Sequence, residues 1–349
     1  TVKEAMQIDR CTWDEDYKNM TQEIRAGLLK LAHADNGDYT TVLMQGSGTF
    51  GVESVLSSVI SSTDKVLVLQ NGAYSKRMVE MCDYHGIKYV VYEEDYAHVP
   101  DPAIVEDVLK SDGNITHISM VHSETTSGLL NDIAAIGELA KKYNKKFIVD
   151  AMSSFGGVDI NVPELGITYL VSSANKCIQG VPGFSFIIAK VSDLKQTKGI
   201  ARSLSLDLYA QWETMEKDGG KWRFTSPTHV VAAFSQALKE LAAEGGVTAR
   251  NARYTATNRA LRKGMEELGF KAYIDEAHQG PIITTFFYPE NCKFTFAKMY
   301  AYLKDHGYVI YPGKLTDAET FRLGNIGEIY MDDVEKIIGI FKDFVSAEN

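Results

Sequence analysis

The sequence predicts an α/β protein in which helices cover both faces of a mostly parallel sheet, followed by a smaller α+β domain. Over roughly the first 190 residues, short apolar runs alternate with segments that have the periodicity of a helix. The runs are apolar throughout, which is typical of strands that have helices on both sides. Beyond that point the chain carries more charge and mixes strands with helices, which indicates the second domain.

The first part of the chain contains the strands and helices of the expected sheet domain. The expected strands cover residues 41–45, 65–70, 88–93, 116–122, 146–151 and 168–174. The expected helices cover residues 52–60, 75–86, 102–110 and 132–143, and Pro102 is a favourable first residue for the third. This succession favours parallel pairing, because parallel neighbours need a crossover connection between them.

The second part of the chain begins with two helical segments. Residues 227–246 predict a helix that stops at Gly245 and Gly246, and residues 247–269 predict a long charged helix that bridges two domains. The elements expected after them are a strand segment at 280–288 and helices at 296–307 and 334–345. We therefore expect a large domain of residues 15–250 and a small domain of residues 1–14 and 251–349.

Composition excludes several classes of function. The chain has 349 residues, 23% of them charged, and a net charge of −10, so no basic field draws it to nucleic acid or anionic membranes. It contains no run of about 18 apolar residues, and its polar N-terminus does not resemble a signal peptide. The four cysteines form no CxxC pair, so we expect no metal site and a cytoplasmic protein.

A glycine loop at residues 45–51, "QGSGTFG", lies between an expected strand and an expected helix. It contains a literal G-x-G-x-x-G, which is typical of dinucleotide sites when an acidic residue follows about 20 positions on. Here the next strand ends in Gln70 and Asn71, and the loop carries Ser47 and Thr49. The loop therefore favours a single phosphate group at a helix N-terminus, with a dinucleotide site or a structural turn as alternatives.

Two polar residues end apolar strands further along the chain. Asp150 ends "KFIVD", and Lys176 follows "TYLVSSA" in "SSANKCIQGVPG", where no neighbour is acidic. Each alone has an ordinary explanation, such as a helix cap for Asp150. Together with a phosphate loop they match the needs of pyridoxal 5'-phosphate, in which a lysine forms a Schiff base and an aspartate pairs with the pyridine nitrogen.

Several motifs make this chain resemble the class V, fold-type I aminotransferases, and within them the 2-aminoethylphosphonate–pyruvate transaminases. These motifs are "LMQGSGTFGVES", "HSETTSG", "FIVDAMSSFGG", "SSANKCIQGVPGFSF", "FTSPTH" and "FRLGNIG". The family pattern begins with a short Gly-Pro-containing segment, and the printed sequence starts just beyond it. The resemblance implies a large domain with a seven-stranded, mostly parallel sheet between helices, and a smaller C-terminal α+β domain.

The resemblance also implies roles for the residues that hold the cofactor. Lys176 and Asp150 are the expected catalytic pair, and the other expected cofactor contacts are Ser47, Gly48, Thr49, Tyr74, Thr125, Asn175 and Thr225. Tyr74 would stack on the cofactor ring, and Thr225 would reach the cofactor phosphate of the neighbouring subunit, so that a homodimer shares its active sites. The structural alternatives are a core position for Tyr74 and a helix cap for Thr225.

The expected substrate contacts are fewer. Arg322 would bind the substrate carboxylate or phosphonate through its planar fork, with a surface ion pair to Glu328 as the alternative. Trp13 is a second candidate, because the N-terminal segment lines the active site in the resembling family.

The implied reaction moves the amino group of 2-aminoethylphosphonate to pyruvate in two half-reactions, giving phosphonoacetaldehyde and L-alanine. An alanine–glyoxylate or serine–glyoxylate transaminase of class V is the main alternative. A cysteine desulfurase would need an activated loop thiol, and Cys292 has no activating partner in sequence. A nicotinamide-dependent oxidoreductase would need the acidic residue that the second strand lacks.

Overall fold

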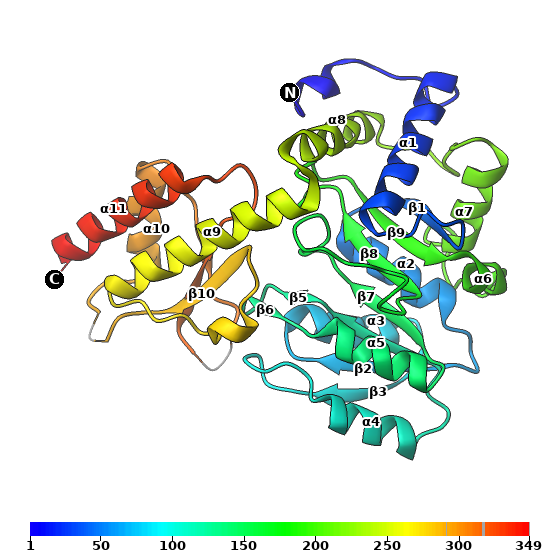
Figure 1. The fold of residues 1–349 in the computed structure, drawn as a ribbon, viewed down its shortest axis with the longest axis horizontal. Helices are drawn as coiled ribbons and strands as arrows, with labels where there is room; N and C mark the ends of the chain where they lie inside the picture. The colour runs from blue at the N-terminus through cyan, green and yellow to red at the C-terminus, as the bar shows by residue number, and fades with distance from the viewer. Residues whose placement is uncertain (291, 316–317, 349) are drawn as a thin grey trace.

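A seven-stranded sheet forms the centre of the larger part of the molecule (Figure 1). The computed structural model describes residues 1–290, 292–315 and 318–348. In spatial order the strands are β1 (Tyr39–Gln45), β9 (Phe184–Lys190), β8 (Tyr169–Ser173), β7 (Lys146–Asp150), β4 (His117–Val121), β2 (Lys65–Gln70) and β3 (Lys88–Glu93). Within this sheet β9 runs antiparallel to β1 and β8, and the other neighbouring strands pair in parallel, which confirms the mostly parallel sheet.

Helices cover both faces of this sheet (Figure 1). Those of the large part are α1 (Glu15–Leu31), α2 (Gly48–Val59), α3 (Ala73–Tyr84), α4 (Pro102–Ser111), α5 (Ile133–Lys142), α6 (Val191–Leu194), α7 (Leu208–Lys217) and α8 (Thr228–Glu244). Helix α2 packs on β8 and β9 and α3 packs on β2, whereas α5 packs on β7 from the other face. Because both faces are covered, all five residues of β4 and of β8 are buried.

The smaller part has its own sheet and its own apolar core. Its strands are β10 (Ile283–Phe287), β11 (Tyr311–Pro312) and β12 (Thr320–Gly324), and its helices are α10 (Phe296–Asp305) and α11 (Met331–Glu348). Phe270, Phe321 and Phe341 pack edge-on or tilted against one another in this core. The predicted α+β character of this segment is therefore present in the fold.

Helix α9 (Gly246–Glu267) joins the two parts, as the sequence predicts (Figure 1). Gly245 ends α8 in the left-handed conformation, with φ at 108°, and α9 starts at the next residue. The short helix η1 (Glu4–Gln7) lies against α8. The division of the chain at residues 14 and 250 stays a prediction, and Asn349, the last residue of the expected small domain, lies outside the described residues.

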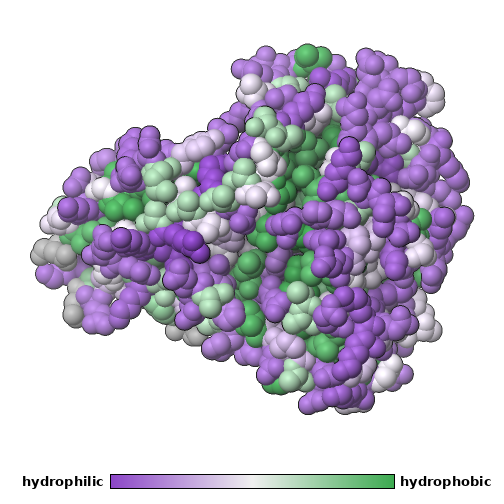
Figure 2. Space-filling view, viewed as in Figure 1, coloured by the Kyte–Doolittle hydropathy of each residue, from purple (hydrophilic) through white to green (hydrophobic). Residues whose placement is uncertain are grey.

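The surface shown in Figure 2 is hydrophilic over most of its rim, and apolar residues gather along its centre, where the two parts meet. Among the described residues, no helix combines the length and the apolar character needed to cross a membrane.

Candidate active site

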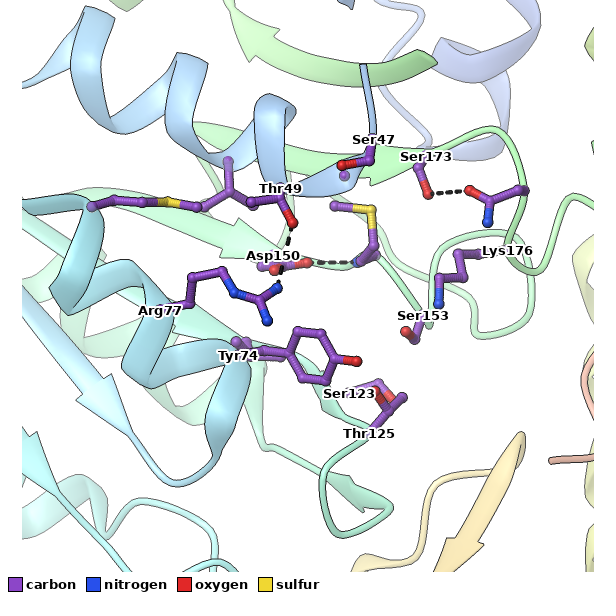
Figure 3. Close-up of a pocket in the computed structure, with 16 residues that line it drawn as sticks. Ser47, Thr49, Tyr74, Arg77, Ser123, Thr125, Asp150, Ser153, Ser173 and Lys176 are labelled. Atoms are coloured by element: carbon purple, nitrogen blue, oxygen red, sulfur yellow. Dashed lines mark hydrogen bonds between the residues drawn. The ribbon is translucent and has the colours of Figure 1, made fainter. Parts of the chain in front are cut away.

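A cavity of about 180 Å³ lies at the carboxyl ends of β4, β7 and β8 (Figure 3). This is the edge at which open α/β sheets bind their ligands. Eight of the eleven predicted site residues line it, namely Ser47, Gly48, Thr49, Tyr74, Thr125, Asp150, Asn175 and Lys176. The structure thus brings together residues from five separate segments of the chain.

The N-terminus of α2 forms one wall of the cavity. Ser47 is the N-cap residue, and its hydroxyl makes no capping hydrogen bond to the helix. The first amides of a helix have no partner within the helix and carry partial positive charge, so this end can hold an anion. Gly48 allows a close approach here, because a Cβ built on it would lie 2.2 Å from Sδ of Met152. The glycine loop therefore opens onto the same cavity as Asp150 and Lys176.

Asp150 ends β7 inside this cavity. Its Oδ1 accepts a hydrogen bond of 2.9 Å from the backbone amide of Met152, and only 6% of the residue is exposed. The pKa of the Asp150 carboxyl is raised to about 7, chiefly by burial and in part by the charge of Glu124. The hydrogen bond from Met152 and the charges of Lys176 and Arg77 act on this pKa in the opposite direction. A ligand with a positive charge would stabilise the ionised form of this buried carboxyl.

Lys176 lies in the connection between β8 and β9 and is half-buried. The turn around it is fixed by backbone hydrogen bonds, from Gln179 to the Lys176 carbonyl at 2.8 Å and from Gly180 to the Ala174 carbonyl at 2.9 Å. Gln179 has a φ of 67° and donates from Nε2 to the Tyr254 hydroxyl at 2.8 Å. The backbone below Lys176 is thus held in place, and its side chain extends into the cavity (Figure 3).

Tyr74 is the second residue of α3 and presents its ring and hydroxyl to the cavity (Figure 3). Burial alone would raise the pKa of Tyr74, but hydrogen bonds from Lys314 and Thr125 and the charges of Lys314 and Lys176 lower it. The ring also packs against the large core, so the structural alternative describes part of its environment.

Arg322, on β12, is 5% exposed and makes no surface ion pair with Glu328. Its Nε donates to the Pro312 carbonyl at 3.1 Å, and its Nη1 donates to the Thr125 carbonyl at 2.9 Å. The second of these bonds ties the small part to the loop that carries Thr125, whereas the first lies within the small part. The two bonds hold the guanidinium beside Tyr74. Burial lowers the pKa of Arg322, and the charge and hydroxyl of Tyr74 offset part of this effect.

Two site residues were not singled out from the sequence. Arg77, one turn of α3 beyond Tyr74, lines the cavity, donates to Oγ1 of Thr49 at 3.4 Å and lies 5.1 Å from the centre of the Tyr74 ring. Glu124 is fully buried, and burial raises the pKa of its carboxyl despite hydrogen bonds from Ser75 and Thr126. Glu124 belongs to the quoted motif "HSETTSG", and Arg77 lies in the helix expected over residues 75–86.

Three of the predicted residues do not line the cavity of this single chain: Arg322, described above, Thr225 and Trp13. Thr225 is exposed, and it does not cap α8, whose N-cap residue is Pro227. Trp13 is 70% exposed, and its ring lies 5.2 Å from Nζ of Lys18 and 4.9 Å from Nζ of Lys221. Trp13 therefore meets surface lysines in this chain, and its expected substrate contact stays a prediction.

The alternative chemistries have little support in the described geometry. Cys292 lies in the small part, beside Phe294, and does not line the cavity that holds Lys176. Gln70, at the position where a dinucleotide site needs an acid, donates from Nε2 to Glu93 at 3.1 Å.

Comparison with known proteins agrees with this geometry. The family model described as "Aminotransferase class-V" matches residues 11–315. The chain is 54% identical over its whole length to a 2-aminoethylphosphonate–pyruvate transaminase of Lysinibacillus sphaericus, of which it covers 95%. It is 55% identical to a protein of the same name from Bacillus cytotoxicus, with 99% of this chain and 94% of that protein covered.

A longer relative and solved structures extend the comparison. A bifunctional phosphonoacetaldehyde hydrolase/aminoethylphosphonate transaminase of Clostridioides difficile is 54% identical over 99% of this chain, which spans about half (54%) of that protein. The ureidoglycine–glyoxylate aminotransferase of Bacillus subtilis shares the fold, with a TM-score of 0.90, 22% identity and coverage of 100% of this chain and 90% of that one. The match over most of the chain, together with the identity to full-length relatives, shows that this chain belongs to the class V aminotransferase family, with the fold-type I architecture.

Proposed function

We propose that this chain is a pyridoxal 5'-phosphate-dependent transaminase that moves the amino group of 2-aminoethylphosphonate to pyruvate, giving phosphonoacetaldehyde and L-alanine. The names of relatives more than half identical over the full chain support this substrate pair. The observation that carries the proposal is that Lys176, Asp150 and the N-terminus of α2 line one cavity.

The residues of the cavity fit this cofactor. The free amides of α2, with the hydroxyls of Ser47 and Thr49, suit its phosphate group. Asp150, held by the amide of Met152, suits the ring nitrogen, and Lys176 suits the aldehyde. Thr125 and Asn175 line the same space, and Asn175 is oriented by a hydrogen bond of 3.1 Å from Oγ of Ser173.

The residues of this chain then have distinct tasks. When bound, pyridoxal phosphate supplies an electron sink for removal of a proton from the carbon that bears the substrate amine. Asp150 is buried, so its carboxylate stabilises positive charge on a partner nitrogen more strongly than an exposed carboxylate would. The Nζ of Lys176 can take the proton and return it, because its side chain reaches into the cavity from a fixed turn.

Arg322 is the proposed binding residue for the carboxylate of pyruvate. Its guanidinium is already oriented by the carbonyls of Pro312 and Thr125, so little freedom is lost when an anion binds. Tyr74 closes the space between Arg322 and the cofactor side of the cavity.

We also propose that the protein acts as a homodimer in the cytoplasm, with Thr225 completing the site of the partner subunit. Large apolar side chains are exposed next to Thr225 and in the glycine loop, namely Phe224 at 51% and Phe50 at 50%. Leu204, whose carbonyl accepts a hydrogen bond from Arg223, is 76% exposed. Burial of these side chains against a second copy would favour association. Thr225 is exposed and does not line the cavity of its own chain, which fits a role in the site of the partner subunit.

An alanine–glyoxylate or serine–glyoxylate activity has weaker support. The alanine–glyoxylate aminotransferase of a Nostoc species shares the fold at a TM-score of 0.87 but only 21% of the sequence, which is a likeness of fold alone.

The test uses purified protein loaded with pyridoxal phosphate. We expect a visible absorption band that 2-aminoethylphosphonate bleaches much faster than serine does when each is mixed alone with the enzyme; L-alanine, the product of the pyruvate half-reaction, should also bleach it by the reverse of that step. We expect Lys176→Ala to lose the band that borohydride fixes covalently, and to slow amine transfer by about 10²–10⁴-fold. Faster bleaching by serine than by 2-aminoethylphosphonate would contradict the proposed donor, and an unchanged Lys176→Ala enzyme would contradict the proposed chemistry.

A further inference from the structure

Lys314 places a second positive charge at the substrate side of the cavity. It follows β11 in the small part, and its Nζ donates a hydrogen bond of 3.1 Å to the hydroxyl of Tyr74. The same Nζ lies 4.6 Å from the centre of the Tyr74 ring, which lines the cavity. Lys314 is thus an exposed lysine whose charged end reaches a residue of the active site.

Arg322 and Lys314 approach Tyr74 from the same region of the small part. Tyr311 pairs with Arg322 in the register of β11 and β12, and Lys314 follows three residues later. Hydrogen bonds from Nε and Nη1 to backbone carbonyls, together with a contact to Tyr74, use part of the Arg322 guanidinium. The remaining donors are enough for the two oxygens of a carboxylate.

Lys314 is available for a ligand. Among residues 1–290, 292–315 and 318–348, no carboxylate forms an ion pair with it, whereas many exposed lysines of this acidic chain have such partners. Its contact in the described structure is the Tyr74 hydroxyl, a partner that an anionic oxygen of a ligand can replace.

The charges around the cavity separate into two groups. Arg77 lies beside Thr49, at the end where the helix N-terminus suits the cofactor phosphate. Lys314 and Arg322 lie around the hydroxyl end of Tyr74, away from that helix. A second anion, belonging to a substrate, is therefore matched at the end of the cavity that the small part closes.

We propose that Lys314 is the residue that recognises the phosphonate group of the amino donor, acting with Arg322 as a two-cation subsite. The inference rests on the proposed function and names the part of the site that selects its substrate. A phosphonate has three oxygens and carries more than one negative charge near neutral pH, so it uses both cations. Pyruvate presents one singly charged carboxylate, which Arg322 binds alone. One site can therefore serve two substrates of different charge.

The experiment compares Lys314→Met, which removes the charge, with Lys314→Arg, which keeps it. Lys336→Met is a matched control, because Nζ of Lys336 also lies over a tyrosine ring, 5.8 Å from the centre of Tyr308. Lys336 lies on α11 and does not line the cavity. We measure KM for 2-aminoethylphosphonate and for pyruvate, and inhibition by methylphosphonate, with each holoenzyme.

We expect Lys314→Met to raise KM for 2-aminoethylphosphonate and the inhibition constant of methylphosphonate by about 10- to 100-fold, the value of one charge-assisted hydrogen bond. KM for pyruvate should change less than about threefold, and Lys314→Arg and Lys336→Met should stay close to the parent.

Two results would overturn the assignment of Lys314: unchanged constants in Lys314→Met, or an equal rise in both KM values. If the parent enzyme itself does not react with 2-aminoethylphosphonate, the proposed function fails. If the parent reacts and Lys314→Met matches it, only the phosphonate subsite fails.

Discussion

Met152 joins the two halves of the cofactor side of the cavity: its amide donates to Oδ1 of Asp150 at 2.9 Å, and its side chain lies against Gly48 at the start of α2. Among the described residues, Asp150 Oδ2 has no hydrogen bond, so this oxygen is left for a ligand. The acid at the end of β7 and the helix terminus of α2 are thus held at a set spacing by one residue.

Asp150→Asn should stabilise the protein without cofactor at neutral pH. The pKa of Asp150 in the folded chain, about 7, lies above its ordinary value of 3.8, so the folded state holds a proton that the unfolded state has lost between these values. Stability from this group is complete below pH 3.8 and is lost as the pH rises to 7. Relative to Asp150→Asn, the parent should lose about 1.4 kcal/mol of unfolding free energy per pH unit between pH 5 and 6.5, and little more above 7.

Urea unfolding of both proteins from pH 5 to pH 8 measures this difference. Subtraction cancels the buried histidines His117 and His122, whose pKa values burial lowers to about 4 in both proteins. A difference that does not change with pH would show that Asp150 is already ionised in the folded protein.

Gly48→Ala should weaken the binding of pyridoxal phosphate by about 10- to 100-fold. The new methyl group would overlap Sδ of Met152, which must move and disturb the spacing between α2 and Asp150. Gly339→Ala is the control, because it lies within α11 and a Cβ there meets nothing within 4 Å. Titration of the visible band measures the affinity, and equal affinity in the two variants would contradict this account of Gly48.

Arg322→Lys should raise KM for pyruvate by about tenfold or more, because an ammonium cannot hold two carbonyls and a carboxylate in the plane of a guanidinium. Arg253→Lys controls for loss of a partly buried arginine, since Arg253 also donates to two backbone carbonyls, of Gly327 and Ile329. Steady-state kinetics give KM for pyruvate in both variants, and only Arg322→Lys should show the rise. Normal pyruvate kinetics in Arg322→Lys would remove Arg322 from the substrate site.

Thr225→Ala should reveal whether subunits share their sites. In mixed dimers with Lys176→Ala, one of the two sites would carry both changes and the other would carry neither, if Thr225 serves the partner. Each mixed dimer then has one intact site out of two. We therefore expect a mixed dimer of the two weakly active variants to reach up to about half of the activity of a parent dimer. Activity that stays at the average of the separate variants would place Thr225 in the site of its own chain.

The sheet and most of its helices were predictable because their residues repeat a local pattern. The strand over 65–70 coincides with β2, and the helix expected from Pro102 to Lys110 ends one residue later, at Ser111. Strand β9 was not predicted, although its sequence "FSFIIAK" is apolar. It returns antiparallel beside β8, so no helix separates the two strands in the sequence, as one usually does between parallel neighbours.

The site was predictable where residues stand at strand ends and not where distant segments meet. Asp150 and Lys176 follow apolar runs, and this position alone directs them to one edge of the sheet. Lys314 lies 240 residues from Tyr74, and their contact depends on how the small part packs on the large one. In the sequence Glu124 is one of several polar residues in its motif. Its hydrogen bond from Ser75 forms only because α3 packs against this loop.

The hairpin of β8 and β9 decides how the proposed proton carrier moves. Both strands lie in the interior of the sheet order, between β7 and β1, so the peptide on either side of Lys176 is braced by paired backbone. Displacement of its ammonium then comes from rotation about the four carbon–carbon bonds of the side chain, which takes picoseconds to nanoseconds. Delivery of a proton by this residue therefore needs rotation of its side chain and no loop opening.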